Sequence, residues 1–198
     1  MSPSARPEIT TIDPVDEETS TKDQAEAQRS TMLRGRIWPL RLATEHDAEA
    51  IRSIYNAEVI GSTATFDLEA RTEAQQLTWI AEHQGAHPAL VALDGEDVIG
   101  FGSLSPYRDR PAYSTTVEDS VYVASTHRGV GVGHAILGEL VRLASEHGFH
   151  TVIARIGAAN AASTSVHTKC GFVMVGIERE IGRKFGRWLD VAVMQKML

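Results

Sequence analysis

The sequence has little cysteine and little positive charge. Its 198 residues include one cysteine, Cys170, which can form neither an intramolecular disulfide nor a cysteine-based metal cluster. With 19 Lys and Arg against 26 Asp and Glu, the formal net charge is −7, which argues against nucleic-acid binding through a general basic surface. These two shortages favour a reducing compartment and a partner other than nucleic acid.

Long apolar runs are also absent. No stretch is long enough to cross a bilayer, and the N-terminus lacks the short apolar core of a secretion signal. His83 and His87 have the spacing of helical metal ligands, but Gly85 and Pro88 interrupt the helix that such ligands need. We therefore expect a soluble, cytoplasmic protein with no membrane partner and no metal.

The composition divides the chain into two parts. Residues 1–34 are rich in Ser, Thr, Glu, Asp, Pro and Ala and carry almost no large apolar side chains, which predicts a disordered leader. A peripheral helix over Lys22–Ser30 is the alternative, although it offers no apolar stripe. Residues 35–198 have the length and the apolar content of one folded domain.

Apolar periodicity and turn residues within this domain predict seven strands and four helices. Thr72 to Gln75 has the form of a capping box that opens a helix, and the residues between Asp94 and Asp97 indicate a hairpin turn. The expected strands are Ile37–Leu42, Ala89–Leu93, Val98–Leu104, Thr116–Val123, Thr151–Ile156, Phe172–Glu180 and Trp188–Met197. The expected helices are Asp47–Ile60, Thr72–His83, Val132–His147 and Ala161–Lys169. Intermixed strands and helices predict an α/β or α+β fold with a mixed sheet.

The most informative segment is the glycine turn, defined here as Arg128–Gly133, which follows the strand residues Val121–Val123. A strand, a glycine-rich turn and a helix N-terminus together present backbone N–H groups and a positive dipole end, which suit a phosphate. His134 follows Gly133, so the lysine of a P-loop is missing, and Ile136 stands where a dinucleotide fingerprint has its last glycine. A plain glycine-rich turn without a ligand remains the alternative.

Further motifs carry a family resemblance. The Arg-x-x-Gly-x-Gly turn after Val-Tyr-Val, followed by Asn160 and by Lys169–Phe172, resembles the acyl-CoA signature of the GNAT superfamily of N-acyltransferases. Ser62–Phe66, Thr116–Val123 and Gly186–Val191 look like the phosphinothricin and methionine sulfoximine N-acetyltransferases. The resemblance implies a mostly antiparallel sheet of seven strands whose fourth and fifth strands splay apart, with acetyl-CoA in the gap.

The same resemblance implies residues that hold acetyl-CoA. The glycine turn is expected to bind the pyrophosphate, with Arg128 adding a charged fork, and strand N–H groups are expected to face the thioester oxygen. Asn160 is expected to contact the pantetheine amide, although a plain helix N-cap is the other interpretation and both can hold. The implied set is Val121, Tyr122, Val123, Arg128, Gly129, Val130, Gly131, Val132, Gly133 and Asn160.

Two residues are candidates for proton transfer. Transfer to an amine requires a base, because an α-amino group with a pKa of about 8 is mostly protonated near neutral pH. Glu118 is the candidate base, since a carboxyl in a partly apolar cleft has a raised pKa, and Asp119 on the opposite face is the weaker choice. His167 is the candidate acid or proton relay. The alternatives are a solvated glutamate and a packed helix-face histidine.

The acceptor pocket is expected at Arg108, Arg110 and Tyr113, with Phe66 as an apolar wall. Arginine can bind a carboxylate or phosphinate through two parallel hydrogen bonds, which favours an amino-acid-type acceptor over a polyamine, an aminoglycoside or a protein lysine. Pro111, Ser114 and Thr115 depart from the family pattern and leave the acceptor itself open. A solvated polar loop and a non-catalytic acyl-CoA-binding domain are further alternatives. In relatives the late hairpin, here residues 179–187, covers a neighbouring subunit's site, which suggests a homodimer.

Overall fold

The computed structural model describes residues 35–157 and 160–198, so the expected leader and its alternative helix lie outside the described residues. The strands are β1 (Leu40–Leu42), β2 (Ala89–Asp94), β3 (Asp97–Pro106), β4 (Thr116–Val123), β5 (Thr151–Gly157), β6 (Val173–Lys184) and β7 (Arg187–Met197). The α-helices are α2 (Ala48–Gly61), α3 (Glu73–Glu82), α4 (Val132–Glu146) and α5 (Ala161–Lys169). None of the described helices is long and apolar enough to span a membrane.

The capping box that the sequence predicts at Thr72 is present. The Thr72 side chain accepts a hydrogen bond from the Gln75 backbone, and the Gln75 side chain accepts one from the Thr72 backbone. The first strand is shorter than expected: it begins at Leu40, and the Ile37 side chain is 90% exposed, because the chain reaches its partner β2 only from Leu40 onward. The sixth strand is longer than expected and runs to Lys184, since its pairing with β7 continues past a bulge to Arg187.

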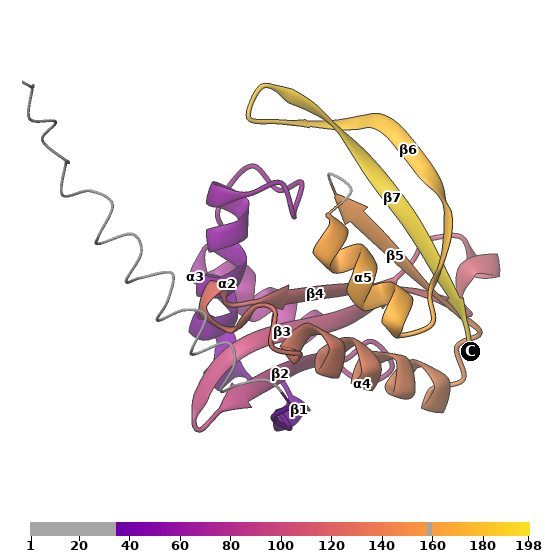
Figure 1. The fold of residues 1–198 in the computed structure, drawn as a ribbon. Helices are drawn as coiled ribbons and strands as arrows, with labels where there is room; N and C mark the ends of the chain where they lie inside the picture. The colour runs from indigo at the N-terminus through magenta and orange to yellow at the C-terminus, as the bar shows by residue number, and fades with distance from the viewer. Residues whose placement is uncertain (1–34, 158–159) are drawn as a thin grey trace, which may run out of the picture. The chain divides into compact units, whose positions relative to one another are not determined.

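All seven strands form one mixed sheet in the order β1-β2-β3-β4-β5-β7-β6 (Figure 1). Only β4 and β5 pair in parallel; every other neighbouring pair is antiparallel. The predicted fold class, a mostly antiparallel mixed α/β sheet flanked by helices, is confirmed.

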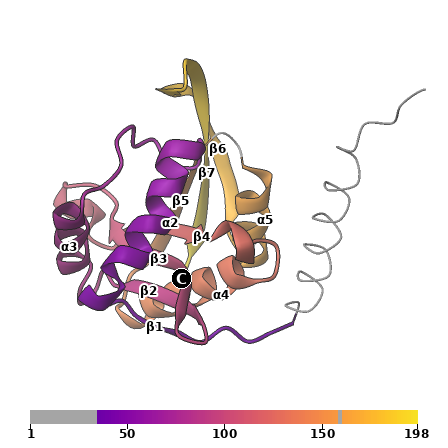
Figure 2. The same cartoon turned by 90° about the vertical axis from the view of Figure 1, so that its left-hand side faces the viewer.

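One face of the sheet carries α4, which packs against β3 and β4 (Figure 2). Two glycines of β3 allow this close approach. A Cβ atom on Gly102 would lie 2.6 Å from Cγ2 of Ile136 in α4, a distance that no real side chain tolerates. Because successive residues of a strand point to opposite faces, Phe101 lies on the other face, where it packs with Ile51 and Tyr55 of α2.

The same alternation sorts the residues of β4. Tyr122 stacks on Phe101 with ring centroids 5.1 Å apart, so Glu118, Ser120 and Tyr122 point to the face of α2. Val121 and Val123 point the other way, since they are the nearest side chains to a Cβ atom built on Gly133 of α4. We call these the α2 face and the α4 face of the sheet.

Candidate functional site

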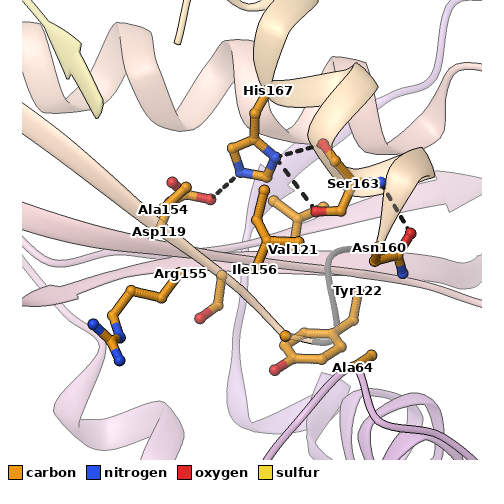
Figure 3. Close-up of a pocket in the computed structure, with 12 residues that line it drawn as sticks. Ala64, Asp119, Val121, Tyr122, Ala154, Arg155, Ile156, Asn160, Ser163 and His167 are labelled. Atoms are coloured by element: carbon orange, nitrogen blue, oxygen red, sulfur yellow. Dashed lines mark hydrogen bonds and ion pairs between the residues drawn. The ribbon is translucent and has the colours of Figure 1, made fainter. Parts of the chain in front are cut away.

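The central strands β4 and β5 separate halfway along their length. They pair from Thr116 to Asp119 on β4 and from Thr151 to Ala154 on β5, and beyond these residues no ladder joins them. A cavity of about 100 Å³ opens in the gap between them (Figure 3). It is lined by Ala64, Asp119, Ser120, Val121, Tyr122, Ala154, Arg155, Ile156, Gly157, Asn160, Ser163 and His167. Since the two strands no longer pair there, the gap connects the α2 face with the α4 face.

The glycine turn leads from β4 into α4. Gly129 and Gly131 have φ angles of 74° and 101°, a left-handed conformation that glycine adopts without strain. Gly131 is the N-cap residue of α4 and contributes no side chain to the cap. The first N–H groups of this helix have no intrahelical partner and carry the positive end of the helix dipole. The turn therefore offers a ready site for an anion beside the gap.

Gly133 differs from Gly129 and Gly131, because its backbone is not left-handed. A Cβ atom on Gly133 would meet Val123 and Val121 at 3.6 and 3.9 Å, which are ordinary contacts, and its backbone is helical. The protein itself therefore leaves room for a small side chain at this position. A side chain at Gly133 would point toward Val121 and Val123 of β4 and would fill space between the first turn of α4 and the gap. This fits a pyrophosphate group at the turn.

Trp38 packs against the glycine turn, a contact that no local sequence pattern predicts because the two segments are far apart in the chain. Its indole Nε1 donates a hydrogen bond to the Val130 carbonyl at 3.4 Å, and the nearest atom to a Cβ built on Gly131 is this same nitrogen, at 4.0 Å. The Trp38 ring also contacts the buried His127 edge-on, with centroids 6.0 Å apart. The turn is thus held in place by packing as well as by its own glycines.

Arg128 lies at the turn but is already paired. Its guanidinium forms an ion pair with Glu58 of α2, and its Nε donates to the Val123 carbonyl at 3.1 Å. The Arg128 side chain remains 53% exposed. Its expected contact with a phosphate stays a prediction, and the structure adds a competing partner that lies 70 positions away in the sequence.

Glu118 points to the α2 face from the paired part of β4. It lies opposite Ser105 on β3 and Ile153 on β5. Its pair with Ile153 is the last but one in the ladder before β4 and β5 separate. Burial raises the pKa of the Glu118 carboxyl, and the positive charge of Arg155 opposes this shift only in part. A half-buried carboxyl with a raised pKa has the properties of a general base, which the sequence analysis expected of this residue.

Asp119 and His167 face each other on the α4 face. His167 Nε2 lies 3.0 Å from Oδ2 of Asp119, and its Nδ1 lies 2.8 Å from the Ser163 carbonyl oxygen (Figure 3). Burial alone would lower the pKa of His167, but the hydrogen bond and the charge of Asp119, together with the Ser163 carbonyl, outweigh it and raise this pKa. The second carboxylate oxygen of Asp119, Oδ1, is buried without a hydrogen-bond partner among the described residues. From the sequence, Asp119 was only the weaker candidate for the base. The signal for its pairing was a carboxylate at a strand position that points to the buried face.

Asn160 caps α5. Its side-chain oxygen accepts hydrogen bonds from the backbone N–H groups of Ala162 and Ser163 at 3.1 and 3.2 Å. The N-cap interpretation is therefore what the structure displays, while the side-chain amide nitrogen remains available to a ligand in the cavity that Asn160 lines. Tyr122, by contrast, directs its ring into the α2 face between Tyr55 and Phe101, so only its backbone is available in the gap.

The expected acceptor residues come from two loops. Phe66 lies on the α2 face against β5 and β6: a Cβ atom on Gly157 would be 3.2 Å from its ring, and one on Gly182 would be 2.2 Å from it. Arg108 lies over the rings of Tyr107 and Tyr113, at 4.9 and 5.7 Å from their centroids. Arg108 and Phe66 are thus on the same side of the sheet as Glu118.

Arg110 is exposed and precedes a 3₁₀ turn over Pro111–Tyr113. No side-chain contact within the described part of the chain directs Arg110 toward the cavity, in contrast to Arg155 of β5, which lines it. Arg155 was not among the site residues expected from the sequence. Its guanidinium forms an ion pair with the carboxylate of Glu178 on β6, with an N–O distance of 2.6 Å. Within residues 35–157 and 160–198, no group of three or more His, Cys, Asp or Glu side chains is arranged to hold a metal ion.

The chain is similar in sequence to known acetyltransferases. Residues 40–193 match the sequence model of the acetyltransferase (GNAT) domain. The chain is 37% identical over 163 residues to a phosphinothricin N-acetyltransferase of Streptomyces coelicolor, covering 80% of this chain and 95% of that protein. It is 35% identical over 160 residues to an L-methionine sulfoximine/L-methionine sulfone acetyltransferase of Salmonella typhimurium, covering 80% of this chain and 94% of that protein.

Solved structures agree. A GNAT superfamily phosphinothricin acetyltransferase from Sinorhizobium meliloti, in complex with acetyl-CoA, superposes with a TM-score of 0.79 at 38% identity. The superposition covers 82% of this chain and 89% of that one. The match therefore spans the seven-stranded sheet and the gap between β4 and β5.

Proposed function

This chain belongs to the GNAT acetyltransferase family and is an acetyl-CoA-dependent N-acetyltransferase, and we propose that its acceptor is the amine of a small amino acid or a close analogue. Analogues of the phosphinothricin and methionine sulfoximine type are the first candidates, because the relatives named for them match nearly their whole length. The observation that carries the proposal is the gap between β4 and β5, which has the glycine turn and His167 on one face and Glu118 on the other.

The residues present fit acetyl-CoA. The helix N-terminus and the two left-handed glycines suit its pyrophosphate, and the free amide of Asn160 lines the path toward the gap. Acetyl-CoA supplies the activated acetyl group when it is bound. The chain's own part is to hold that group in the gap, where the backbone N–H groups of Val121–Val123 that point away from β3 can donate to the acyl oxygen as it becomes negative.

Proton transfer divides between the two faces. On the α2 face, Glu118 takes a proton from the acceptor ammonium, directly or through a water, so that the nitrogen can form its bond to the acyl carbon. On the α4 face, His167 gives a proton to the sulfur as the carbon–sulfur bond breaks. Each group lies on the face where its reaction partner has to be, because the acetyl group passes through the sheet from the cofactor side to the acceptor side.

Charge favours a zwitterionic acceptor. The α2 face carries the carboxylates of Glu118 and Glu178 together with the cations of Arg155 and Arg108, and the charges of both arginines act to lower the pKa of Glu118 against the larger effect of burial. A purely cationic acceptor such as a polyamine would bring no anion to the guanidinium N–H groups that the Arg155–Glu178 ion pair does not use. We keep Phe66 and Tyr113 as apolar walls of the acceptor site, and Arg110 as a contact at its rim.

The proposal is tested by the release of free thiol from acetyl-CoA with a panel of amines. Methionine sulfone, methionine sulfoximine and phosphinothricin should be acetylated with kcat/KM well above that of their decarboxylated amines, of spermidine and of a lysine peptide. Preference for spermidine or the peptide would replace the amino-acid acceptor with a cationic one. Tight binding of acetyl-CoA without turnover of any amine would indicate a silent binding domain.

We also propose that the protein is a homodimer through β6. This strand forms one edge of the sheet, and an exposed strand edge is a template for pairing with another chain. Its exposed apolar side chains are unusually many: Val173, Met174, Val175, Ile177 and Ile181, with Phe185 and Trp188 beside them. Light scattering should give twice the chain mass for the wild type and the single chain mass for Val175→Lys. A wild type that is monomeric at micromolar concentration would refute the dimer.

A further inference from the structure

An ion pair on the α2 face joins β5 to β6 beside the gap. Nη2 of Arg155, on β5, lies 2.6 Å from Oε2 of Glu178, on β6, and the two side chains are 28% and 33% exposed. Arg155 lines the cavity between the strands, and in Figure 3 it points to the opposite side of β5 from His167. It is a charged side chain on the acceptor side of the site, and it is fixed to a central strand.

The strand register places this pair with the candidate base. Glu118 lies opposite Ile153 in the parallel ladder, and Arg155 follows Ile153 by two residues, so Glu118 and Arg155 share one face of the sheet. Gly157 follows Arg155 by a further two residues and faces the Phe66 ring. Glu118, Arg155 and the Phe66 ring therefore lie on the same face of the sheet.

In this position the guanidinium of Arg155 has N–H donors without a partner among the described residues. Toward the described residues its guanidinium forms only the ion pair with Glu178, which engages one end of a group that has five N–H donors. Glu178 neutralises the charge and lies against one nitrogen of the planar group, and the remaining N–H groups can donate to a carboxylate in a bidentate contact. Among the charges that act on Glu118, that of Arg155 lowers its pKa more than that of Arg108 does, which agrees with the nearer position of Arg155.

We propose that Arg155, oriented by Glu178, binds the α-carboxylate of the acceptor amino acid while Glu118 faces its amine. The inference rests on the proposed function and adds to it the residue that selects amino acids over simple amines. In an α-amino acid the carboxylate and the amine are bonded to the same carbon, so the cation that holds the carboxylate has to lie beside the base. Arg155 is on the strand next to Glu118, whereas Arg108 and Arg110 are exposed residues of the loop between β3 and β4 and do not line the cavity.

The test compares L-methionine sulfone with 3-(methylsulfonyl)propylamine, which is the same molecule without its α-carboxylate. The wild type should prefer the amino acid in kcat/KM. In Arg155→Gln this preference should fall by about ten- to one-hundred-fold, the range for the loss of a charge-assisted hydrogen bond, mainly through a higher KM for the amino acid. The kcat/KM of the amine should change little, because the amine never engages the guanidinium.

A paired substitution guards against misfolding. Arg155→Gln leaves Glu178 without its counter-ion, so the double variant Arg155→Gln/Glu178→Gln removes both charges and should show the same loss of preference. The matched control is Arg142→Gln/Glu139→Gln, which removes another arginine–glutamate pair on the surface of α4. This control should keep the wild-type preference and the wild-type KM values.

Three outcomes decide the matter. A preference that survives in both Arg155 variants but is lost in Arg108→Gln would overturn the assignment and move the carboxylate to the loop. Equal losses for amino acid and amine would give Arg155 a structural role only. A wild type that acetylates neither compound, although it releases thiol with some other amine, would refute the proposed acceptor class itself, which keeps that failure distinct from a failure of Arg155.

Discussion

His167 presents both of its ring nitrogens to hydrogen-bond acceptors, and the carboxylate of Asp119 is one of them. Nε2 lies 3.0 Å from Asp119 Oδ2, and Nδ1 lies 2.8 Å from the Ser163 carbonyl oxygen. A carboxylate and a carbonyl can only accept, so the ring satisfies both contacts when each nitrogen carries a proton. The geometry therefore favours the imidazolium form, buried beside its counter-ion on the α4 face, as the proposed proton donor requires.

The first prediction concerns the pH dependence that Asp119 imposes. Its carboxylate helps to raise the pKa of His167, so Asp119→Asn should move the alkaline limb of kcat to lower pH. Profiles of kcat against pH for the two proteins, measured with saturating acetyl-CoA, test this. An alkaline limb that stays in place would mean that Asp119 does not control the protonation of His167.

Stability should follow the same linkage. Because the folded pKa of His167 is raised, its contribution to the free energy of unfolding is complete below the ordinary histidine pKa of about 6.5 and is lost as pH rises through the folded pKa. Asp119→Ala should lower the free energy of unfolding by roughly 3–5 kcal/mol near pH 6, the cost of leaving one partner of a buried ion pair alone. The difference between the two proteins, followed by urea unfolding, should shrink toward pH 9.

The second prediction concerns the base. Glu118→Gln keeps the shape of the side chain and removes its basicity, so kcat should fall by about 10²–10⁴-fold while the KM for acetyl-CoA stays unchanged. A change of kcat smaller than a few-fold, with the chemical step rate-limiting, would leave Glu118 a structural role. Asp190→Asn, on the half-exposed outer part of β7, is a matched control that should not alter kcat.

Glu118→Gln should also stabilise the protein near neutral pH. Burial raises the pKa of this carboxyl, so its ionised form destabilises the folded state as pH rises through and above its ordinary value of about 4.3. The variant should therefore have a higher Tm than the wild type at pH 7, and the gain should disappear below pH 4. A variant with a lower Tm at pH 7 would contradict the assigned burial of charge.

The third prediction separates space for the ligand from space within the protein. A Cβ atom at Gly133 makes only ordinary contacts with Val121 and Val123, so the fold should persist in Gly133→Val, but the added side chain would fill space between the first turn of α4 and the gap. The KM for acetyl-CoA should rise at least tenfold, and the KM for the acceptor should change little. Gly138→Val in the same helix, where a Cβ atom meets nothing within 4 Å, is the control and should leave both constants unchanged. An unaltered cofactor KM in folded Gly133→Val would refute the pyrophosphate site.

The fourth prediction concerns the apolar wall. A Cβ atom at Gly182 would lie 2.2 Å from the Phe66 ring, which is the movable end of a side chain, so Gly182→Ala should fold but displace the ring. The KM for the acceptor should rise by a few-fold, with the KM for acetyl-CoA constant. Phe66→Leu in the Gly182→Ala background should recover part of the loss, because the smaller side chain leaves room for the methyl group. No effect of Gly182→Ala on acceptor KM would remove Phe66 from the acceptor site.

Local patterns were enough to predict the elements of this fold. The alternation of Thr116–Val123, the capping box at Thr72 and the apolar stripe of α4 depend on residues close in sequence, and each is present in the structure. The glycines at 129 and 131 also act locally, since their left-handed backbone is a property of the turn itself. The sequence by itself therefore determined the strands, the helices and the left-handed glycines of the turn.

Only the tertiary structure decided how charged residues pair. Asp119 and His167 are 48 positions apart, and Arg128 and Glu58 are 70 apart, so no periodicity within an element connects them. The parallel register of β4 with β5 sets Glu118 and Arg155 on one face, and the antiparallel return of β6 beside β7 brings Glu178 to Arg155. The physical reason is that the alternation within one strand shows which of its own residues share a face. Which residues of different strands become neighbours depends on strand pairing and register, which only the tertiary structure sets.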